Sequence, residues 1–193
     1  MNGGRKAAAG RIRIIGGSLR NSRLDVPELP GLRPTPERVR ETLFNWLAPV
    51  IDGARCLDLC AGTGALGIEA LSRGAAGVQF VERDARVAQS LRANLARLEA
   101  DAGQVAVLDA GLFLQGAAQP YDLVFLDPPF ALDLWPALAR QLEQGGWLAA
   151  RGWVYVESPR GLAPALPPNW QLHREGQAGE VRFALYRRAL PLS

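Results

Sequence analysis

The sequence predicts an α/β fold, in which helices cover both faces of a mostly parallel sheet that ends in an antiparallel hairpin. Three observations predict it. From residue 54 onward, short apolar runs alternate with segments of helical periodicity, which is the pattern of successive β-α-β units. The apolar runs are nearly continuous, as expected of parallel strands that are buried on both faces. After residue 169 the alternation stops, and two strand-like runs follow each other across a glycine-rich segment.

The first part of this core is expected to contribute three strands and two helices. The strands span Arg55–Ala61, Gly77–Glu82 and Gln104–Leu108. The helices span Ala65–Arg73, which Gly74 ends, and Asp84–Glu99. In the longer helix, apolar residues three or four positions apart mark one buried stripe, namely Val87, Leu91, Leu95 and Leu98.

The second part begins with a short helix near residues 110–116 and continues with the strand Tyr121–Leu126. A helix over Leu132–Glu143, closed by two glycines, and the strand Trp153–Glu157 follow. The closing hairpin is expected to pair Trp170–Glu175 with Val181–Arg187 across a turn at Gly176–Gly179.

Ahead of the core, Arg11–Ile15 predicts a short strand that ends at two glycines. A helix is expected to begin near Thr35, which suits the N-cap position, with Pro36 at the first helical position. The apolar face of this helix consists of Val39, Leu43, Trp46 and Leu47. We therefore divide the chain into a basic N-terminal arm, residues 1–34, expected to form a β-hairpin, and a main domain of residues 35–193.

Composition excludes several classes of protein. The chain is 48% hydrophobic and 21% charged, as ordinary globular domains are, and no apolar run approaches the length of a membrane span. The N-terminus is basic but lacks the apolar run of a signal peptide. We therefore expect a cytoplasmic protein without membrane contact, acting as a monomer.

The two cysteines, Cys56 and Cys60, are expected to be small buried side chains on one face of a strand. A metal site would need further ligands, and His173 is the only histidine. We therefore expect no metal.

Charge is distributed unevenly along the chain. Residues 1–40 hold nine basic and three acidic residues, a net charge of +6, which leaves −3 for the remainder. This pattern favours an arm that binds a polyanion, although a solvated tail would have the same composition. The residues expected to contact phosphates or line that surface are Arg11, Arg13, Arg20, Arg23, Arg33, Thr35, Arg38 and Arg40.

A glycine loop at Asp58–Gly64 follows the first core strand and opens a helix, so that the backbone can turn tightly and approach a ligand closely. Glu82 ends the next strand, at the spacing expected of a carboxylate that binds ribose hydroxyls. Gly67 completes the pattern G-x-G-x-x-G, so a dinucleotide or a purely structural turn remains an alternative.

Two features favour S-adenosylmethionine as the ligand of this loop. Asp58 suits a cationic ligand end better than a pyrophosphate, and the chain has no second substrate-binding domain. Asp109 could accept a hydrogen bond from the adenine amine, or else cap the helix that follows it. The residues expected to bind the ligand are Asp58, Cys60, Ala61, Gly62, Thr63, Gly64, Glu82, Arg83, Asp109, Ala110 and Asp127.

A second motif, Asp127-Pro128-Pro129-Phe130, ends the strand Tyr121–Leu126. The two prolines fix the backbone and donate no N–H. A carboxylate and backbone carbonyls are thereby held beside an aromatic ring, where a planar amine would find acceptors and a stacking surface. The motif therefore indicates chemistry on the exocyclic amine of a nucleobase.

Together these segments resemble class I methyltransferases, which are Rossmann-like, and more narrowly the RsmD family of bacterial 16S ribosomal RNA guanine-N2 methyltransferases. The resemblance covers nearly the whole chain, and it departs from the family at Leu19, where an aromatic residue is common. The matching segments are Arg13–Gly17, Gly31–Thr35, Arg38–Leu47, Leu57–Gly67, Asp127–Phe130 and Asn169–Glu175.

The resemblance implies transfer of a methyl group from S-adenosylmethionine to guanine N2 in ribosomal RNA, either free or in the small subunit. It implies that Asp127, Pro128, Pro129 and Phe130 are catalytic, with Asp127 and the Pro128 carbonyl as acceptors and Phe130 stacking on the base. It leaves open whether Asp127 removes a proton or only orients the amine.

Two other functions remain alternatives at this point. The same motif serves adenine N6 methylation in DNA, although this chain lacks a large target-recognition domain. A noncatalytic RNA-binding ribosome assembly factor is the third possibility, against which the intact Gly62, Gly64, Glu82 and Asp127 argue.

Overall fold

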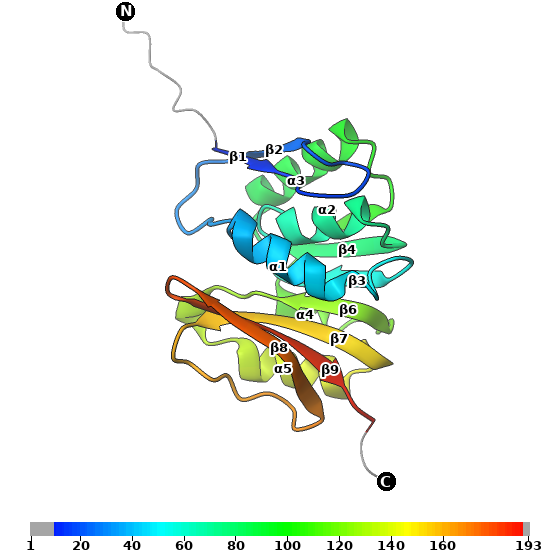
Figure 1. Ribbon diagram of the computed structural model, residues 1–193, viewed down its shortest axis with the longest axis vertical. Helices are drawn as coiled ribbons and strands as arrows, with labels where there is room; N and C mark the ends of the chain where they lie inside the picture. The colour runs from blue at the N-terminus through cyan, green and yellow to red at the C-terminus, as the bar shows by residue number, and fades with distance from the viewer. Residues whose placement is uncertain (1–9, 191–193) are drawn as a thin grey trace, which may run out of the picture.

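The computed structural model describes residues 10–190, which form a seven-stranded sheet between two layers of helices and a separate two-stranded hairpin (Figure 1). The strand order in the large sheet is β5-β4-β3-β6-β7-β9-β8. The strands are β1 Gly10–Arg13, β2 Arg23–Val26, β3 Arg55–Asp58, β4 Gly77–Glu82, β5 Gly103–Val107, β6 Tyr121–Leu126, β7 Leu148–Pro159, β8 Trp170–Ala178 and β9 Val181–Arg188. The helices are α1 Glu37–Leu47, α2 Ala65–Ser72, α3 Ala85–Arg97, α4 Ala110–Phe113 and α5 Trp135–Gln144, with a 3₁₀ turn η1 at Phe130–Leu132.

The five strands from β5 to β7 are parallel, and β9 and β8 follow them antiparallel, which confirms the predicted sheet. Parallel pairing brings the carboxyl ends of β3, β4, β5, β6 and β7 to one edge of the sheet. From β3, the chain adds β4 and β5 on one side and then returns to add β6 on the other side. The order of strands therefore reverses between β3 and β6. Ligands of open α/β sheets bind at such an edge.

Each face of the sheet buries its own layer of helices. On one face, α1, α2 and α3 contribute residues such as Leu43, Ile68 and Leu91 to a core that also contains Phe80 and Phe125. On the other face, α4 and α5 pack over a second core, which is centred on the following residues: Leu57, Val124, Trp135, Leu138 and Val156. Near-continuous apolar strands are what this double coverage requires.

Several predicted boundaries are wrong. The first core strand ends at Asp58 and not at Ala61, because the chain turns away into the glycine loop. The helix expected from Leu132 begins at Trp135, since Asp133 has a φ of 45° and separates it from η1. The strand predicted as Trp153–Glu157 extends over Leu148–Pro159.

The hairpin turn also differs from the prediction. Ala178 pairs with Val181, so the turn is Gly179-Glu180, and Gly176 lies within β8. A Cβ at Gly176 would come within 2.5 Å of the Phe183 ring. Gly176 therefore makes room for a packed aromatic side chain on the neighbouring strand.

At the other end of the molecule, β1 and β2 form an antiparallel pair beside α3 (Figure 1). Ile12, Ile14, Leu24 and Val26 of this arm are buried in the same core as α1 and α2. Glu69 of α2, which is fully buried, accepts hydrogen bonds from the backbone N–H groups of residues 15 and 16. The arm of residues 10–34 is thus packed onto the body, while Arg5 and Lys6, which contributed to its predicted charge, lie outside the described residues.

No helix within residues 10–190 is both long enough and apolar enough to cross a membrane.

Candidate active site

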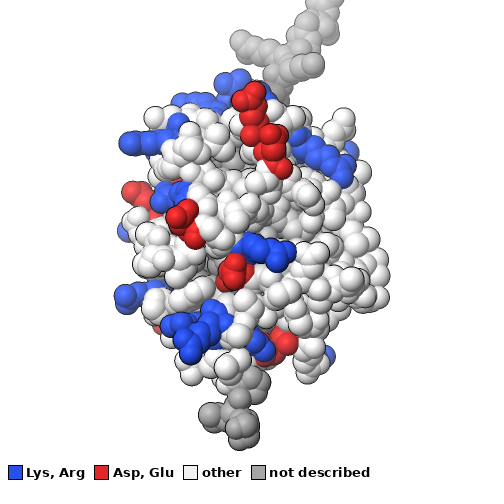
Figure 2. Space-filling model, turned by 90° about the vertical axis from the view of Figure 1, so that its right-hand side faces the viewer, with Lys and Arg blue, Asp and Glu red and all other residues white. Residues whose placement is uncertain are grey.

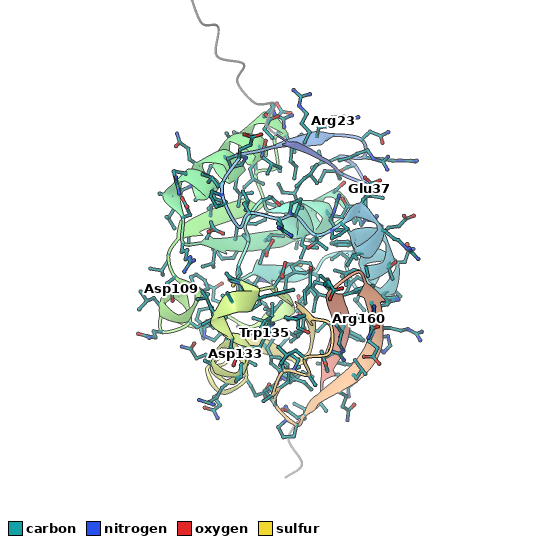
Figure 3. The ribbon with its side chains drawn as sticks, turned by 90° about the vertical axis from the view of Figure 1, so that its left-hand side faces the viewer. Arg23, Glu37, Asp109, Asp133, Trp135 and Arg160 are labelled. Carbon is teal, nitrogen blue, oxygen red and sulfur yellow. The ribbon has the colours of Figure 1, made fainter. Side chains whose placement is uncertain are left out.

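A cavity of about 870 Å³ lies at the edge of the sheet where the parallel strands end. Its walls come from the segment that joins β2 to α1, from the loops after β3, β4, β5 and β6, and from the end of β7. Asp109 and Arg160, which both line the cavity, lie on opposite sides of Trp135 in Figure 3. A volume of this size accommodates a cofactor together with part of a substrate.

Most of the residues predicted from the sequence line this cavity. They are Asp58, Cys60, Ala61, Gly62, Thr63, Glu82, Arg83, Asp109, Ala110, Asp127, Pro128, Pro129 and Phe130. Gly64 is the exception among the predicted ligand-binding residues. It has a φ of 78°, and a Cβ there would come within 2.3 Å of Leu91, so Gly64 turns the chain and packs on α3.

The glycine loop fixes the carboxylate of Glu82 at the cavity wall. The backbone N–H of Gly62 donates to Glu82 Oε2 at 2.8 Å, and the N–H of Asp84 donates to Oε1 at 3.1 Å. Gly62 itself has a φ of 54°, which favours glycine at this close approach. Glu82 therefore has a fixed orientation, with acceptor capacity left on both oxygens.

Asp58 lines the cavity and is almost fully buried. Its Oδ2 accepts a hydrogen bond from the N–H of Gly67 in α2 at 3.1 Å. Burial raises the pKa of Asp58 to about 8, and the nearby charge of Glu82 adds to the effect. A cationic group in the cavity would reverse this shift by favouring the ionised carboxylate.

Asp109 follows β5 and caps α4, because its Oδ1 accepts from the N–H of Leu112 at 3.2 Å. Capping was one of the two alternatives for this residue. A contact between Asp109 and an adenine amine remains a prediction.

The Asp127–Phe130 segment follows β6, the strand next to β3, and lines the same cavity as the glycine loop. Asp127 is half-buried and Pro128 is buried, whereas Phe130 is 37% exposed and packs against Trp135 with 5.8 Å between ring centroids. The pKa of Asp127 is raised well above its usual value by burial, and also by the charges of Glu157 and Asp58. An acidic group and an accessible aromatic ring thus line the same cavity.

Glu157 was missed by the sequence analysis, although it lines the same cavity. Its Oε2 accepts hydrogen bonds from the hydroxyls of Tyr155 at 2.9 Å and Thr35 at 3.1 Å. The available signal was its position, because Glu157, like Glu82, was the last residue of a strand predicted from the sequence. Burial raises the pKa of Glu157.

The predicted polyanion-binding residues divide into two groups. Arg11, Arg20, Arg23, Arg33 and Arg38 are exposed, and Arg33 also lines the cavity. Arg13 is half-buried and forms an ion pair with Glu37. On the opposite side of the molecule from that in Figure 3, charges of both signs are scattered and neither sign dominates (Figure 2).

Thr35 and Arg40 belong to the packed body, which corrects their predicted contact with phosphates. Thr35 is buried and does not cap α1 with its side chain, since its hydroxyl donates to Glu157. Arg40 is 2% exposed and donates to the backbone carbonyls of Thr35 at 3.1 Å and Arg13 at 2.9 Å. Burial also lowers the pKa of Arg40.

The two cysteines do not share a face of the sheet, because Cys60 lies beyond the end of β3. Cys56 packs in the core with α1 and α2, whereas Cys60 packs against the core on the other face. Burial raises the pKa of Cys56 to about 12 and raises that of Cys60 as well, so both are neutral thiols. Within residues 10–190 there is no group of three or more His, Cys, Asp and Glu side chains placed to hold a metal ion.

Comparisons with known proteins agree with this architecture. The profile of the family described as Conserved hypothetical protein 95 matches residues 12–187. Ribosomal RNA small subunit methyltransferase D of Escherichia coli strain K12 is 53% identical over 184 residues, which are 94% of this chain and 92% of that protein. The protein of the same name from Haemophilus influenzae is 42% identical over 184 residues, covering 93% and 95% of the two chains.

Solved structures are also similar. The structure of Escherichia coli yhhF has a TM-score of 0.86 and 52% identity, and the match covers 94% of this chain and 99% of that one. An RNA methyltransferase from Salinibacter ruber, in complex with S-adenosyl-L-homocysteine, has a TM-score of 0.62 at 19% identity, covering 83% and 97% of the chains. At that identity the similarity concerns the fold alone.

Proposed function

This chain belongs to the family described as Conserved hypothetical protein 95, the RsmD family, and has its class I methyltransferase fold. We propose that it is a ribosomal RNA methyltransferase that transfers a methyl group from S-adenosylmethionine to N2 of a guanine in 16S RNA. The observation that carries the proposal is the half-buried Asp127, held by Pro128 and Pro129 beside the accessible ring of Phe130 at the ligand-binding edge of the sheet.

The residues of the cavity fit S-adenosylmethionine. Glu82, oriented by two backbone N–H groups, would bind the ribose hydroxyls. Asp58, whose pKa of about 8 reflects a buried carboxyl without a counter-charge, would bind the ammonium of the amino-acid tail. Asp109, which lines the same cavity, would accept a hydrogen bond from the adenine amine. When bound, S-adenosylmethionine supplies an electrophilic methyl group on a sulfonium.

Asp127 and the Pro128 carbonyl act on the nitrogen that attacks. The lone pair of guanine N2 is delocalised into the ring, so acceptors that bind its hydrogens help it to localise. With S-adenosylmethionine bound, the N–C bond would form as the C–S bond breaks, and the electron pair would stay on sulfur. Asp127, with its raised pKa, can then take the proton that the methylated nitrogen releases. Phe130 stacks on the base and keeps the nitrogen in line with the methyl group.

The exposed arginines of the arm would hold the RNA by its phosphates, which position a substrate without reading its sequence. The target guanine would have to leave its stack or lie in a loop to enter the cavity. On this proposal the protein acts in the cytoplasm on ribosomal RNA or on the small subunit, and it acts as a monomer.

Substitution of Asp127 tests the proposal. Asp127→Ala should lower the rate of methyl transfer to undermodified ribosomal RNA by about 100- to 10,000-fold. The variant loses both the hydrogen-bond acceptor for the amine and the group that takes the proton from the methylated nitrogen. Binding of S-adenosylmethionine, measured by calorimetry, should stay nearly intact, because Asp58 and Glu82 remain to hold it. Asp101→Ala, an exposed matched control, should leave both unchanged.

Mass spectrometry of the digested product identifies the modified base. The proposal requires N2-methylguanosine, and N6-methyladenine would refute it. Normal transfer by Asp127→Ala would remove the role given to this residue, and absence of any cofactor binding by the unaltered protein would favour a noncatalytic RNA-binding protein.

A further inference from the structure

Glu157 is a buried carboxylate whose polar atoms are held by neighbours, with one exception. Glu157 is 5% exposed, and its Oε2 accepts from the Thr35 and Tyr155 hydroxyls. The backbone carbonyl of Glu157 accepts from the indole N–H of Trp135 at 2.9 Å. Contacts from Thr35 ahead of α1, from Tyr155 on the same strand and from Trp135 of α5 thus fix the position of this residue.

The exception is Oε1, for which no donor exists among residues 10–190. Among the same residues, Ser158 Oγ is the one fully buried polar side-chain atom that has no hydrogen-bond partner. Glu157 Oε1 also has no partner but is not fully buried, so it is accessible from the cavity that Glu157 lines. Burying a carboxylate with an unused acceptor is costly, and a donor on a ligand would remove that cost.

Glu157 lies beside Asp127. The strands β6 and β7 are parallel, and Leu126 pairs with Val156, so the next residue of each strand comes at neighbouring positions on the same face. Adjacent strands are about 4.8 Å apart, which lets two such side chains reach one ligand. The charge of Glu157 contributes to the raised pKa of Asp127, as expected of neighbouring carboxylates.

We propose that Glu157 determines specificity for guanine, by accepting the N1–H hydrogen bond of the base whose 2-amino group is held by Asp127. This inference rests on the proposed function, and it assigns the contact that distinguishes guanine from other bases at the site. Asp127 alone cannot do so, because any base with an exocyclic amine offers it a donor.

The Watson–Crick edge explains why a second carboxylate has this effect. Guanine presents two adjacent donors there, N1–H and the 2-amino group. Adenine and cytosine present an amine next to a ring nitrogen that is an acceptor. An ionised Glu157 would place Oε1 against the lone pair of that ring nitrogen. Two hydrogen-bond acceptors would then meet with no hydrogen between them, which disfavours adenine and cytosine. Burial raises the pKa of Glu157, whereas the hydroxyls of Thr35 and Tyr155, which donate to Oε2, favour the ionised form, and a donor at N1 of the base would add to their effect.

The test uses 2-aminopurine, which has the same 2-amino group as guanine but an acceptor at N1. Ribosomal RNA carrying guanosine or 2-aminopurine riboside at the modified position is offered in whichever form, free or assembled, the unaltered protein methylates. The unaltered protein should prefer guanine in kcat/KM by about 10- to 100-fold, the effect of one hydrogen bond to a charged group.

Glu157→Gln should reduce this preference about tenfold or more, because an amide N–H₂ at the position of Oε1 meets N1–H poorly and the lone pair of 2-aminopurine well. 2-Aminopurine also lacks O6, but this difference affects the unaltered protein and Glu157→Gln equally. It therefore cancels when their preferences for guanine are compared. Tyr155→Phe, which removes one of the two donors that orient Glu157, should reduce the preference by a smaller factor. Glu99→Gln, an exposed matched control at the end of α3, should retain the full preference.

Two results would overturn the inference. One is equal kcat/KM of the unaltered protein for guanine and 2-aminopurine, which needs no variant. The other is an undiminished preference in Glu157→Gln, with unchanged binding of S-adenosylmethionine. Should Glu157→Gln fail to fold, an undiminished preference in Tyr155→Phe would count equally against it. Failure of the proposed function would give a different result from failure of this inference, because the unaltered protein would then make no N2-methylguanosine.

Discussion

At the scale of single residues, the cavity is notable for carboxylates that lack a basic partner. Asp58, Asp127 and Glu157 all have raised pKa values, and burial is the largest cause for each. All three lie near the carboxyl ends of parallel strands and line the same cavity. Such an arrangement reduces stability and is typical of a site that binds a cationic or hydrogen-bond-donating ligand.

The loss of stability caused by burying Asp58 should depend on pH, because the carboxyl group titrates. Its pKa rises from 3.8 to about 8 on folding, so the folded protein keeps a proton that the unfolded chain loses. The free energy of unfolding should therefore fall as pH rises from about 4 to 8. Asp58→Asn cannot titrate and can still accept from Gly67, so it should gain a few kcal/mol relative to the unaltered protein over that range, at about 1.4 kcal/mol per pKa unit.

Denaturant unfolding without ligand at several pH values measures this difference. Asp101→Asn, at an exposed position, should follow the unaltered protein throughout. A constant difference between Asp58→Asn and the unaltered protein from pH 4 to 8 would show that Asp58 ionises normally in the fold.

At the scale of elements, apolar strand patterns and helix periodicity were sufficient to predict the sheet and the principal helices. Two details depended on contacts between distant segments and could not be predicted. Gly176 was assigned to a turn, although it lies in β8 because Phe183 of β9 occupies the space that a side chain would take. The helix after Phe130 was started too early, since the positive φ of Asp133 has no clear signature in the sequence.

The joint between α2 and the sheet offers a test at this scale. A Cβ at Gly67 would come within 2.3 Å of the Phe80 ring, so Gly67→Ala must displace α2 or the ring. The expected loss of stability is about 1–3 kcal/mol, as for other overpacked cores. Thermal unfolding measures it, with Gly10→Ala as the control, because a Cβ there meets nothing within 4 Å. Equal melting temperatures for the two variants would contradict the packing described for α2.

At the scale of the whole molecule, the parallel topology brings the glycine loop after β3 and the Asp127–Phe130 motif after β6 to one edge of the sheet. The roles of Glu157, Thr35 and Arg40 depend on long-range contacts, which is why the sequence analysis missed the first and misassigned the other two. Thr35 and Glu157 are 122 positions apart in the chain, and no local pattern connects them. Charge distribution predicted a basic arm, but composition cannot separate an exposed arginine from a buried one.

The exposed arginines of the arm make a prediction about RNA binding. Arg20→Gln with Arg23→Gln should weaken RNA affinity and lower the slope of log K against log salt by about 1–2, since each lost phosphate contact removes about 0.7–0.9. Affinity for S-adenosylmethionine should not change. Filter binding across a salt series measures the slope, and the paired control is Arg140→Gln with Arg151→Gln, two exposed positions outside the arm. An equal slope in both double variants would place the RNA elsewhere on the protein.

The docking of the arm onto α2 has a consequence for protein engineering. A truncated chain that began at residue 35 would lose Ile12, Ile14, Leu24 and Val26 from the core and leave Glu69 without its two backbone donors. Such a truncation would produce an insoluble or unfolded product in place of a minimal catalytic fragment. Exchange of arms between relatives would succeed only if α2 were exchanged with them.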